Sequence, residues 1–332
     1  MSSMVAKEEQ YLVPPSYGSV NKPFNEEEEE EEEDTTTTTT EEGSSGGGSS
    51  SSSSHWELSF LFEAEQPSKR ERHAFATPDE SQTIEVVLDT ADDEPGATQS
   101  GNYLWPAAET LARYLVQNYS SNNNYKNNNQ QPAVVVELGA GNALVSIAAW
   151  QLWATSLQCL IVTDHDPSTL ERARNNHETT LEELLDSHHC ANEDDEFTTI
   201  NNIGSIPTHF EQLDWNHGQY DVKYVQELIM EHSVPAQTKA DTVLGSDLIY
   251  HASVVEPLFQ TAVLLLMGGG VNDKKTNTTT ASRGRFLLSQ SFAYDGETEL
   301  EIERCCHELG LTRTVLWEDQ GGKNRILQFH FL

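Results

Sequence analysis

A glycine-rich turn at residues 137–141 is the segment whose residue types point most clearly to chemistry. It reads Glu-Leu-Gly-Ala-Gly and follows the run Val134–Val136. Apolar, β-branched residues predict a buried parallel strand. Gly139 and Gly141 allow the chain to turn sharply, so that a ligand can lie against its backbone. A helix expected from residue 144 would point its positive end at the same place, which predicts a nucleotide-type ligand there.

A second candidate binding residue, Asp164, ends the next expected strand. A carboxylate in this position can accept hydrogen bonds from both hydroxyls of a ribose. Its spacing from Gly141 suits one strand–helix–strand step of about 20 residues. The alternative is a helix cap, but Asp166 followed by Pro167 already has the pattern of a cap and a first helical residue. We therefore expect Asp164 to bind ribose.

Two other kinds of site fit the sequence poorly. A nicotinamide-binding turn needs a third glycine where this chain has Leu144, so a dehydrogenase is a distant alternative. The run 188–190, His-His-Cys, has no second ligand pair at a spacing typical of zinc sites. No metal site is predicted.

Alternating strand and helix patterns surround these residues and must position them. Repeated strand–helix–strand order predicts an α/β fold with a doubly wound, mostly parallel sheet, closed at one edge by an antiparallel hairpin. An N-terminal β-hairpin or flap is expected from strands at 56–62 and 83–88, followed by a helix that begins near Pro106. The other expected strands are 134–138, 159–163, 208–213, 242–247, 285–291, 311–317 and 326–331, and the other expected helices are 144–153, 167–185, 253–267 and 297–309.

Composition divides the chain into a tail and a folded domain. Residues 1–55 contain an acidic run, a threonine run and a Gly/Ser tract, which offer almost no apolar surface to offset the entropy of ordering. We expect a disordered tail over 1–55 and one domain over 56–332, with its flap at 56–100. Residues 187–206 and 216–239 are interpreted as insertions.

The charge of the chain limits its partners. The net charge is −35, and residues 1–55 account for −11 of it, with thirteen acidic residues against two lysines. Such a field repels phosphate backbones, which argues against nucleic acid, and it favours a basic protein surface. Four cysteines without C-x-x-C spacing, no signal peptide and no membrane-length apolar run predict a protein of the cytoplasm or nucleus. We expect this protein to be a monomer.

Four blocks of sequence together resemble the family-16 group of S-adenosylmethionine-dependent methyltransferases, which have a seven-stranded, Rossmann-like class I fold and include protein-lysine methyltransferases. The Leu-Trp-Pro-Ala-Ala segment at 104–108, with the helix after it, resembles the entry helix of the family. Residues 137–141 resemble its cofactor turn, Leu-Asp-Trp at 213–215 resembles the end of its third strand, and 244–250 resembles its G-A-D-x-x-Y segment.

The resemblance implies the role of each matching residue. Asp247 and Tyr250 would face the methyl-transfer site and orient an acceptor lysine. Ala143 departs from the family, because it stands where the third glycine of G-x-G-x-G is usual. The implied contacts to S-adenosylmethionine come from Trp105, Glu137, Gly139, Ala140, Gly141, Asp164, Trp215 and Ser246.

The function expected from this resemblance is methylation of a lysine side chain on a protein. Two alternatives stay open: a non-catalytic domain that binds a basic partner, and a small-molecule N-methyltransferase. Single residues also have simpler interpretations. Trp105 and Trp215 could be core aromatics, and Tyr250 could be an ordinary half-buried tyrosine.

Overall fold

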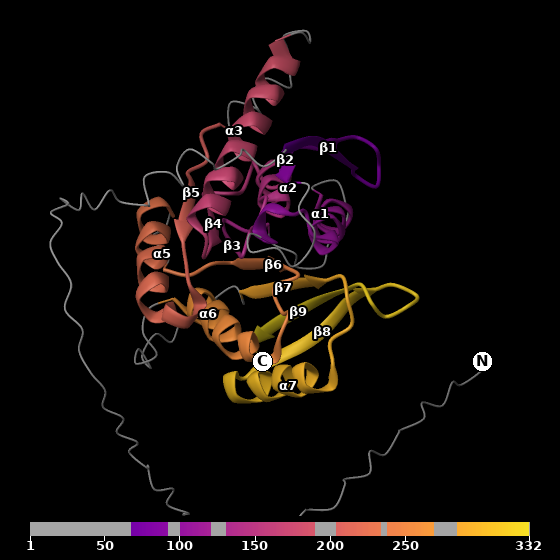
Figure 1. Cartoon of the computed structure of the whole chain (residues 1–332). Coiled ribbons are helices and arrows are strands. Elements are labelled where there is room, and N and C mark those ends of the chain that lie inside the picture. The colour runs from indigo at the N-terminus through magenta and orange to yellow at the C-terminus, as the bar shows by residue number, and fades with distance from the viewer. Residues whose placement is uncertain are drawn as a thin grey trace, which may run out of the picture. The chain divides into compact units, whose positions relative to one another are not determined.

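Strand β3 (Val134–Leu138), which leads into the glycine turn, lies in the middle of a seven-stranded sheet of order β5-β4-β3-β6-β7-β9-β8 (Figure 1). The computed structural model describes residues 68–91, 100–120, 131–189, 204–233, 238–268 and 284–331. All of them belong to one compact unit, Glu57–Leu332. The tail at 1–55, the expected strand at 56–62 and most of the 187–206 insertion lie outside the described residues.

The strand order follows from the hydrophobic pattern of each strand. β3 and β4 (Cys159–Asp164) are buried along their whole length, as central parallel strands require. β5 (Thr208–Gln212), β6 (Thr242–Ser246) and β7 (Arg285–Gln290) extend the parallel sheet on its two sides. β9 (Arg325–Phe331) pairs antiparallel with β7, and β8 (Leu311–Glu318) pairs antiparallel with β9 at the edge. The predicted doubly wound sheet with its terminal hairpin is confirmed.

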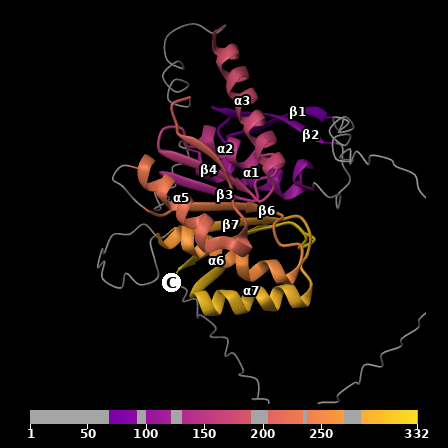
Figure 2. The same cartoon turned by 60° about the vertical axis from the view of Figure 1, so that its left-hand side comes forward.

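Helices cover both faces of the sheet (Figures 1 and 2). One face packs against α1 (Pro106–Tyr119), α2 (Leu144–Leu152) and α3 (Pro167–His189). The other packs against α5 (Gly218–His232), α6 (Val255–Met267) and α7 (Gly296–Leu309). Short 3₁₀ turns, η2 (Ser100–Asn102), η3 (Trp215–His217) and η4 (Ala252–Val254), lie in the connections.

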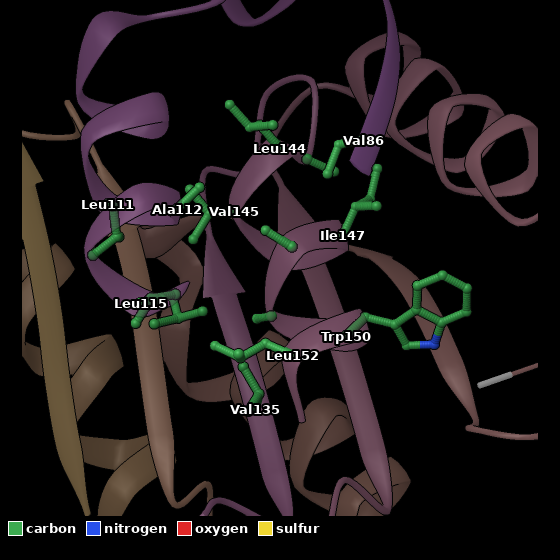
Figure 3. Packing of buried hydrophobic residues seen from close by; sticks show 14 of the residues in the cluster. Val86, Leu111, Ala112, Leu115, Val135, Leu144, Val145, Ile147, Trp150 and Leu152 are labelled. Atoms are coloured by element: carbon green, nitrogen blue, oxygen red, sulfur yellow. The ribbon is translucent and has the colours of Figure 1, made fainter. Parts of the chain in front are cut away.

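The core beneath the glycine turn joins elements that are distant in sequence (Figure 3). Val86 of the N-terminal hairpin and Val135 of β3 meet residues of α1 and α2 in one buried cluster. α2 is buried along its whole length, so the helix that follows the turn has little freedom to move. The labelled members of this cluster are Val86, Leu111, Ala112, Leu115, Val135, Leu144, Val145, Ile147, Trp150 and Leu152.

The N-terminal hairpin is present, but with a first strand that the sequence pattern did not predict. β1 (Ser68–Ala76) pairs antiparallel with β2 (Thr83–Ala91). β2 is docked on α3, where the Thr180 hydroxyl donates to the Val87 carbonyl and accepts from the Val87 amide, both at 3.1 Å. β1 is charged and mostly exposed, and cross-strand ion pairs such as Arg70–Asp89 join it to β2. Its pattern therefore lacks the apolar alternation by which strands are usually recognised.

The segment 216–239, interpreted as an insertion, contains helix α5. α5 connects β5 to β6, as an ordinary crossover helix of a doubly wound sheet does. Its apolar side chains Val222, Val225 and Ile229 are buried against the sheet. Their spacing of three and four residues is a helical signal that is present in the sequence.

Candidate functional site

The chain order of the sheet places its topological switch point between β3 and β6. After β3 the chain continues to β4 and β5 on one side, then returns to place β6 on the other side of β3. Ligands of open α/β sheets bind outside the carboxyl ends of the strands at such a point. The turn 139–143 follows β3 there, and Asp247 follows β6. The fold therefore brings these two segments, about a hundred residues apart in sequence, to one location.

The backbone of the turn alternates into the left-handed region. φ is 55° at Gly139, 54° at Gly141 and 62° at Ala143. Ala143 thus adopts the conformation for which the family pattern has glycine, at a cost for an L-residue of about 1 kcal/mol. The turn is attached to β4, since the Ala140 amide donates to the Thr163 carbonyl at 2.9 Å.

Asp164 lies directly beside this turn. Its Oδ2 accepts a hydrogen bond from the Gly141 amide at 3.1 Å, and its Oδ1 accepts from the Asp166 amide at 3.1 Å. A carboxylate offers about four lone-pair sites, so both oxygens keep acceptor capacity for hydroxyl groups. The carboxylate also raises the pKa of the neighbouring His165. The structure thus places the Asp164 carboxylate in contact with the glycine turn.

Trp215 borders the turn on the other side. A Cβ built on Gly139 would lie 3.4 Å from the Trp215 Cζ2 and 2.6 Å from the Leu248 Cδ2. Glycine is favoured at this position, because its φ is positive and an added Cβ would require the Leu248 side chain to shift. Trp215 is half-buried, which leaves part of its indole available for stacking. Leu248 was not singled out by the sequence analysis, although it lies inside the 244–250 block.

Glu137 is placed beneath the turn, in contact with helix α2. Its side chain is 1% exposed, and its Oε2 accepts hydrogen bonds from the amide and the hydroxyl of Ser146 in the first turn of α2. Burial raises the pKa of Glu137 to about 8. Its Oε1 is buried and has no hydrogen-bond partner among the described residues. Glu137 therefore holds the first turn of α2 against the end of β3.

Asp247 makes a comparable connection on the β6 side. It has a φ of 52°, and its Oδ2 accepts from the Ala107 amide at 3.2 Å in the first turn of α1. The amide and hydroxyl of Ser291, at the end of β7, also donate to this carboxylate. Burial raises the pKa of Asp247 against the opposing effect of these hydrogen bonds. Ser291 was not among the predicted site residues, although it follows the strand beside the one that Asp247 follows.

The other predicted residues are distributed unevenly around the switch point. Trp105 precedes α1 and packs edge-to-face on Tyr103, with ring centroids 5.5 Å apart. Ser246 ends β6, opposite Ser289 of β7. Tyr250 is 73% exposed, so it lies on the surface and not in an enclosed site. The buried tyrosine hydroxyl near Asp247 belongs to Tyr294, whose pKa is raised by burial and by the Asp247 charge.

The geometry at the switch point fits S-adenosylmethionine. The glycine turn lets a ligand approach its backbone closely, Asp164 has acceptor capacity for a ribose, and Trp215 offers an aromatic face. Among the described residues, no group of three or more His, Cys, Asp or Glu is placed to hold a metal ion. None of the described helices combines the length and apolar character needed to cross a bilayer.

Comparison with known proteins agrees with this geometry. The family model described as lysine methyltransferase matches residues 85–192, which include the glycine turn and Asp164. The match confirms the resemblance to the family-16 methyltransferases that was found in the sequence. That family uses S-adenosylmethionine as its cofactor. No curated protein matches the chain.

The solved structures that match the chain include methyltransferases of distant sequence, with TM-scores below 0.5. A candidate O-methyltransferase from Nostoc punctiforme has 12% identity and a TM-score of 0.39, with 67% of this chain and 55% of that chain covered. A candidate S-adenosylmethionine-dependent methyltransferase from Streptococcus mutans has 10% identity and a TM-score of 0.42, with 78% and 55% covered. An O-methyltransferase from Bacillus cereus has 10% identity and a TM-score of 0.36, with 69% and 82% covered. This chain thus spans about half the length of the first two.

Proposed function

We propose that this protein is an S-adenosylmethionine-dependent methyltransferase that modifies a lysine side chain on a protein. The observation that carries the proposal is the hydrogen bond between the Gly141 amide and the Asp164 carboxylate at the switch point of the sheet. It joins the turn for the methionine portion to the carboxylate for the ribose in one site. The lysine acceptor is supported by the description of the matching family.

Different segments of the chain would bind different parts of the cofactor. The turn from Gly139 to Ala143 would lie under the methionine portion, Asp164 would accept the ribose hydroxyls, and Trp215 would border the adenine. When bound, the cofactor supplies a methyl group that its sulfonium has already activated. The protein therefore acts mainly by alignment and by exclusion of water.

A lysine acceptor must lose its proton, because an ammonium has no lone pair with which to attack a methyl carbon. Its ordinary pKa is about 10.4. A carboxylate beside the amine would raise that pKa further, so Asp247 is unsuited to activate it. Both oxygens of Asp247 already accept hydrogen bonds from Ser291 or Ala107. We assign Asp247 to holding the α1 entry helix and the β7 loop around the acceptor, with orientation of the amine as a secondary role.

Equilibrium binding and methyl transfer test this function together. S-adenosylmethionine should bind the full chain, and Asp164→Ala should weaken binding strongly, because the ribose loses its acceptor. Labelled methyl groups should enter a protein band in a cell extract poor in methylation, and mass spectrometry should place them on lysine. Label only in small molecules would indicate a metabolite N-methyltransferase. Absence of cofactor binding, with stable capture of a basic protein, would indicate the non-catalytic alternative.

The cellular location belongs to the same proposal. We expect the protein to act in the cytoplasm or nucleus, where its four cysteines stay reduced and the cofactor is made available to it. Fluorescence microscopy of the tagged full chain tests this. A signal confined to a secretory compartment would contradict it.

A further inference from the structure

A groove of about 430 Å³ lies between η4 and the first half of α7. It begins three residues after Leu248, whose side chain lies over Gly139 in the glycine turn. The β6–α6 connection therefore runs without interruption from the proposed cofactor site to this groove. The residues that line it are His251, Ala252, Ser253, Glu297, Leu300, Glu301 and Arg304.

The groove carries a local excess of negative charge. Arg304 is the one permanently charged cation among its lining residues, and three carboxylates, Glu256, Glu301 and Glu308, are paired with it. Glu297 adds a fourth carboxylate and is exposed in the first turn of α7. Glu256 and Glu308 are not among the residues that line the groove. The lining itself therefore has one guanidinium against two carboxylates, a balance of −1, and the two further carboxylates bring the charge of its surroundings to −3. Such a surface attracts a cationic side chain and repels an acidic one.

The groove also offers apolar surface next to its carboxylates. Leu300 is 68% exposed and Tyr250, at the start of the same connection, is 73% exposed. Lysine and arginine place their aliphatic stems on apolar surface and keep their charged ends near carboxylates or water. An exposed leucine next to the Glu297 and Glu301 carboxylates suits a ligand with this combination of properties better than it suits a purely polar or a purely apolar one.

We propose that this groove docks a lysine or arginine residue that lies close to the acceptor lysine in the sequence of the protein substrate. The inference rests on the proposed function and adds a substrate preference to it. The stem of the docked residue lies on Leu300, and its charge faces Glu297 and Glu301. The exposed position of Tyr250 then follows from its place between the methyl-transfer site and the groove.

A labelled hexa-arginine peptide is the probe, because it carries the required charge and has no lysine to be methylated. Fluorescence anisotropy measures how tightly the peptide binds the full chain. Enzyme assays measure how strongly the peptide inhibits methyl transfer to the protein that is methylated in the cell extract. Glu297→Lys should weaken peptide binding about tenfold, since a like charge then faces the arginines. Leu300→Ser should also weaken it, without any change of charge.

Glu303→Lys is the matched control. Glu303 is also exposed on α7, but it does not line the groove. Glu303→Lys makes the same change of charge as Glu297→Lys, but outside the groove. Its effect on peptide binding should therefore be small. Thermal melting checks that every variant is folded, and S-adenosylmethionine affinity should be unchanged in all of them. The peptide should compete with the protein substrate and not with the cofactor.

The outcomes separate this inference from the proposed function. Equal peptide affinity in Glu297→Lys and Glu303→Lys, in a protein that methylates lysine, overturns the docking groove alone. Absence of both cofactor binding and methyl transfer overturns the proposed function. In that case the peptide affinities of Glu297→Lys and Glu303→Lys still show whether the groove binds a cationic side chain. A dimer in sedimentation that Glu297→Lys dissociates would assign the groove to a second copy of the chain and overturn the substrate docking.

Discussion

The Asp247 carboxylate accepts hydrogen bonds from both the backbone amide and the hydroxyl of Ser291, at 2.7 and 2.6 Å. These two residues directly follow the adjacent parallel strands β6 and β7, and the same carboxylate also accepts a hydrogen bond from the Ala107 amide at the start of α1. Asp247 thus ties three segments together at the carboxyl edge of the sheet. Its left-handed backbone aims the side chain between them.

Ser291→Ala tests this connection. The variant removes one hydrogen bond to a partly buried carboxylate, so the free energy of unfolding should fall by about 1–3 kcal/mol. Ser81→Ala is the control, because the Ser81 hydroxyl donates to Asp79 on the exposed surface and its loss should cost under about 0.5 kcal/mol. Denaturant unfolding measures both. Equal effects would show that the Asp247–Ser291 bond contributes no more than a surface bond.

Gly139→Ala should both destabilise the protein and abolish cofactor binding. The new methyl group would lie 2.6 Å from the Leu248 Cδ2, in addition to the strain of a φ of 55°. Overpacking of this kind costs about 1–3 kcal/mol, and the left-handed backbone adds about 1 kcal/mol. Calorimetric titration with S-adenosylmethionine and denaturant unfolding provide the measurements.

Gly310→Ala is the matched control for that variant. Gly310 has a φ of 67°, but a Cβ there would meet nothing within 4 Å. It should lose only the backbone contribution of about 1 kcal/mol and bind the cofactor normally. If the two variants were equally unstable and bound the cofactor equally well, the packing around Gly139 would be unimportant.

Ala143→Gly should leave stability nearly unchanged, although Ala143 is fully buried. Relief of the left-handed strain, about 1 kcal/mol, opposes the loss of one buried methyl group, about 0.8 kcal/mol. Ala148→Gly, in the middle of the same helix α2, gains no such relief and should cost about 2 kcal/mol. Comparable losses in both variants, measured by urea unfolding, would show that Ala143 is unstrained.

The buried Glu137 predicts a pH dependence of stability. Its pKa is raised to about 8 in the folded protein, so the folded state binds one proton more than the unfolded state between about pH 4.5 and 8. The stability that this proton contributes is present at low pH and is lost as the pH rises toward 8. The Glu137→Gln variant has no such proton to lose. As the pH rises through this range, its free energy of unfolding should therefore increase relative to that of the unmodified protein by up to about 1.4 kcal/mol per pH unit.

Urea unfolding without cofactor, at several values between pH 5 and 8, measures this difference. Glu178→Gln, at an exposed position of α3, should follow the unmodified protein at every pH. Parallel stability curves for Glu137→Gln and the unmodified protein would show that Glu137 is ionised in the folded state throughout this range.

Local patterns in the sequence were sufficient to predict the sheet and the core of the site. The seven strands expected for the main sheet and the five expected helices all form, most with bounds within two residues of the structure, because the apolar run or the periodicity of each element marks it in the sequence. The Gly139–Gly141 turn and Asp164 were predictable for the same reason. Each follows a strand directly, and parallel strands place such ends along one edge.

Contacts between distant segments decided the rest. β1 is a strand because its backbone pairs with β2 along its whole length and Phe75 is buried, and the exposed ion pairs of Arg70 and Arg72 add little; its own polar sequence does not reveal this pairing. The different places of Tyr250, on the surface, and Tyr294, with its hydroxyl buried near Asp247, depend on how the loops after β6 and β7 pack. Periodicity determines which face of an element is buried, but hydrogen bonds such as Asp247–Ser291 arise only when the tertiary fold brings two chain segments together.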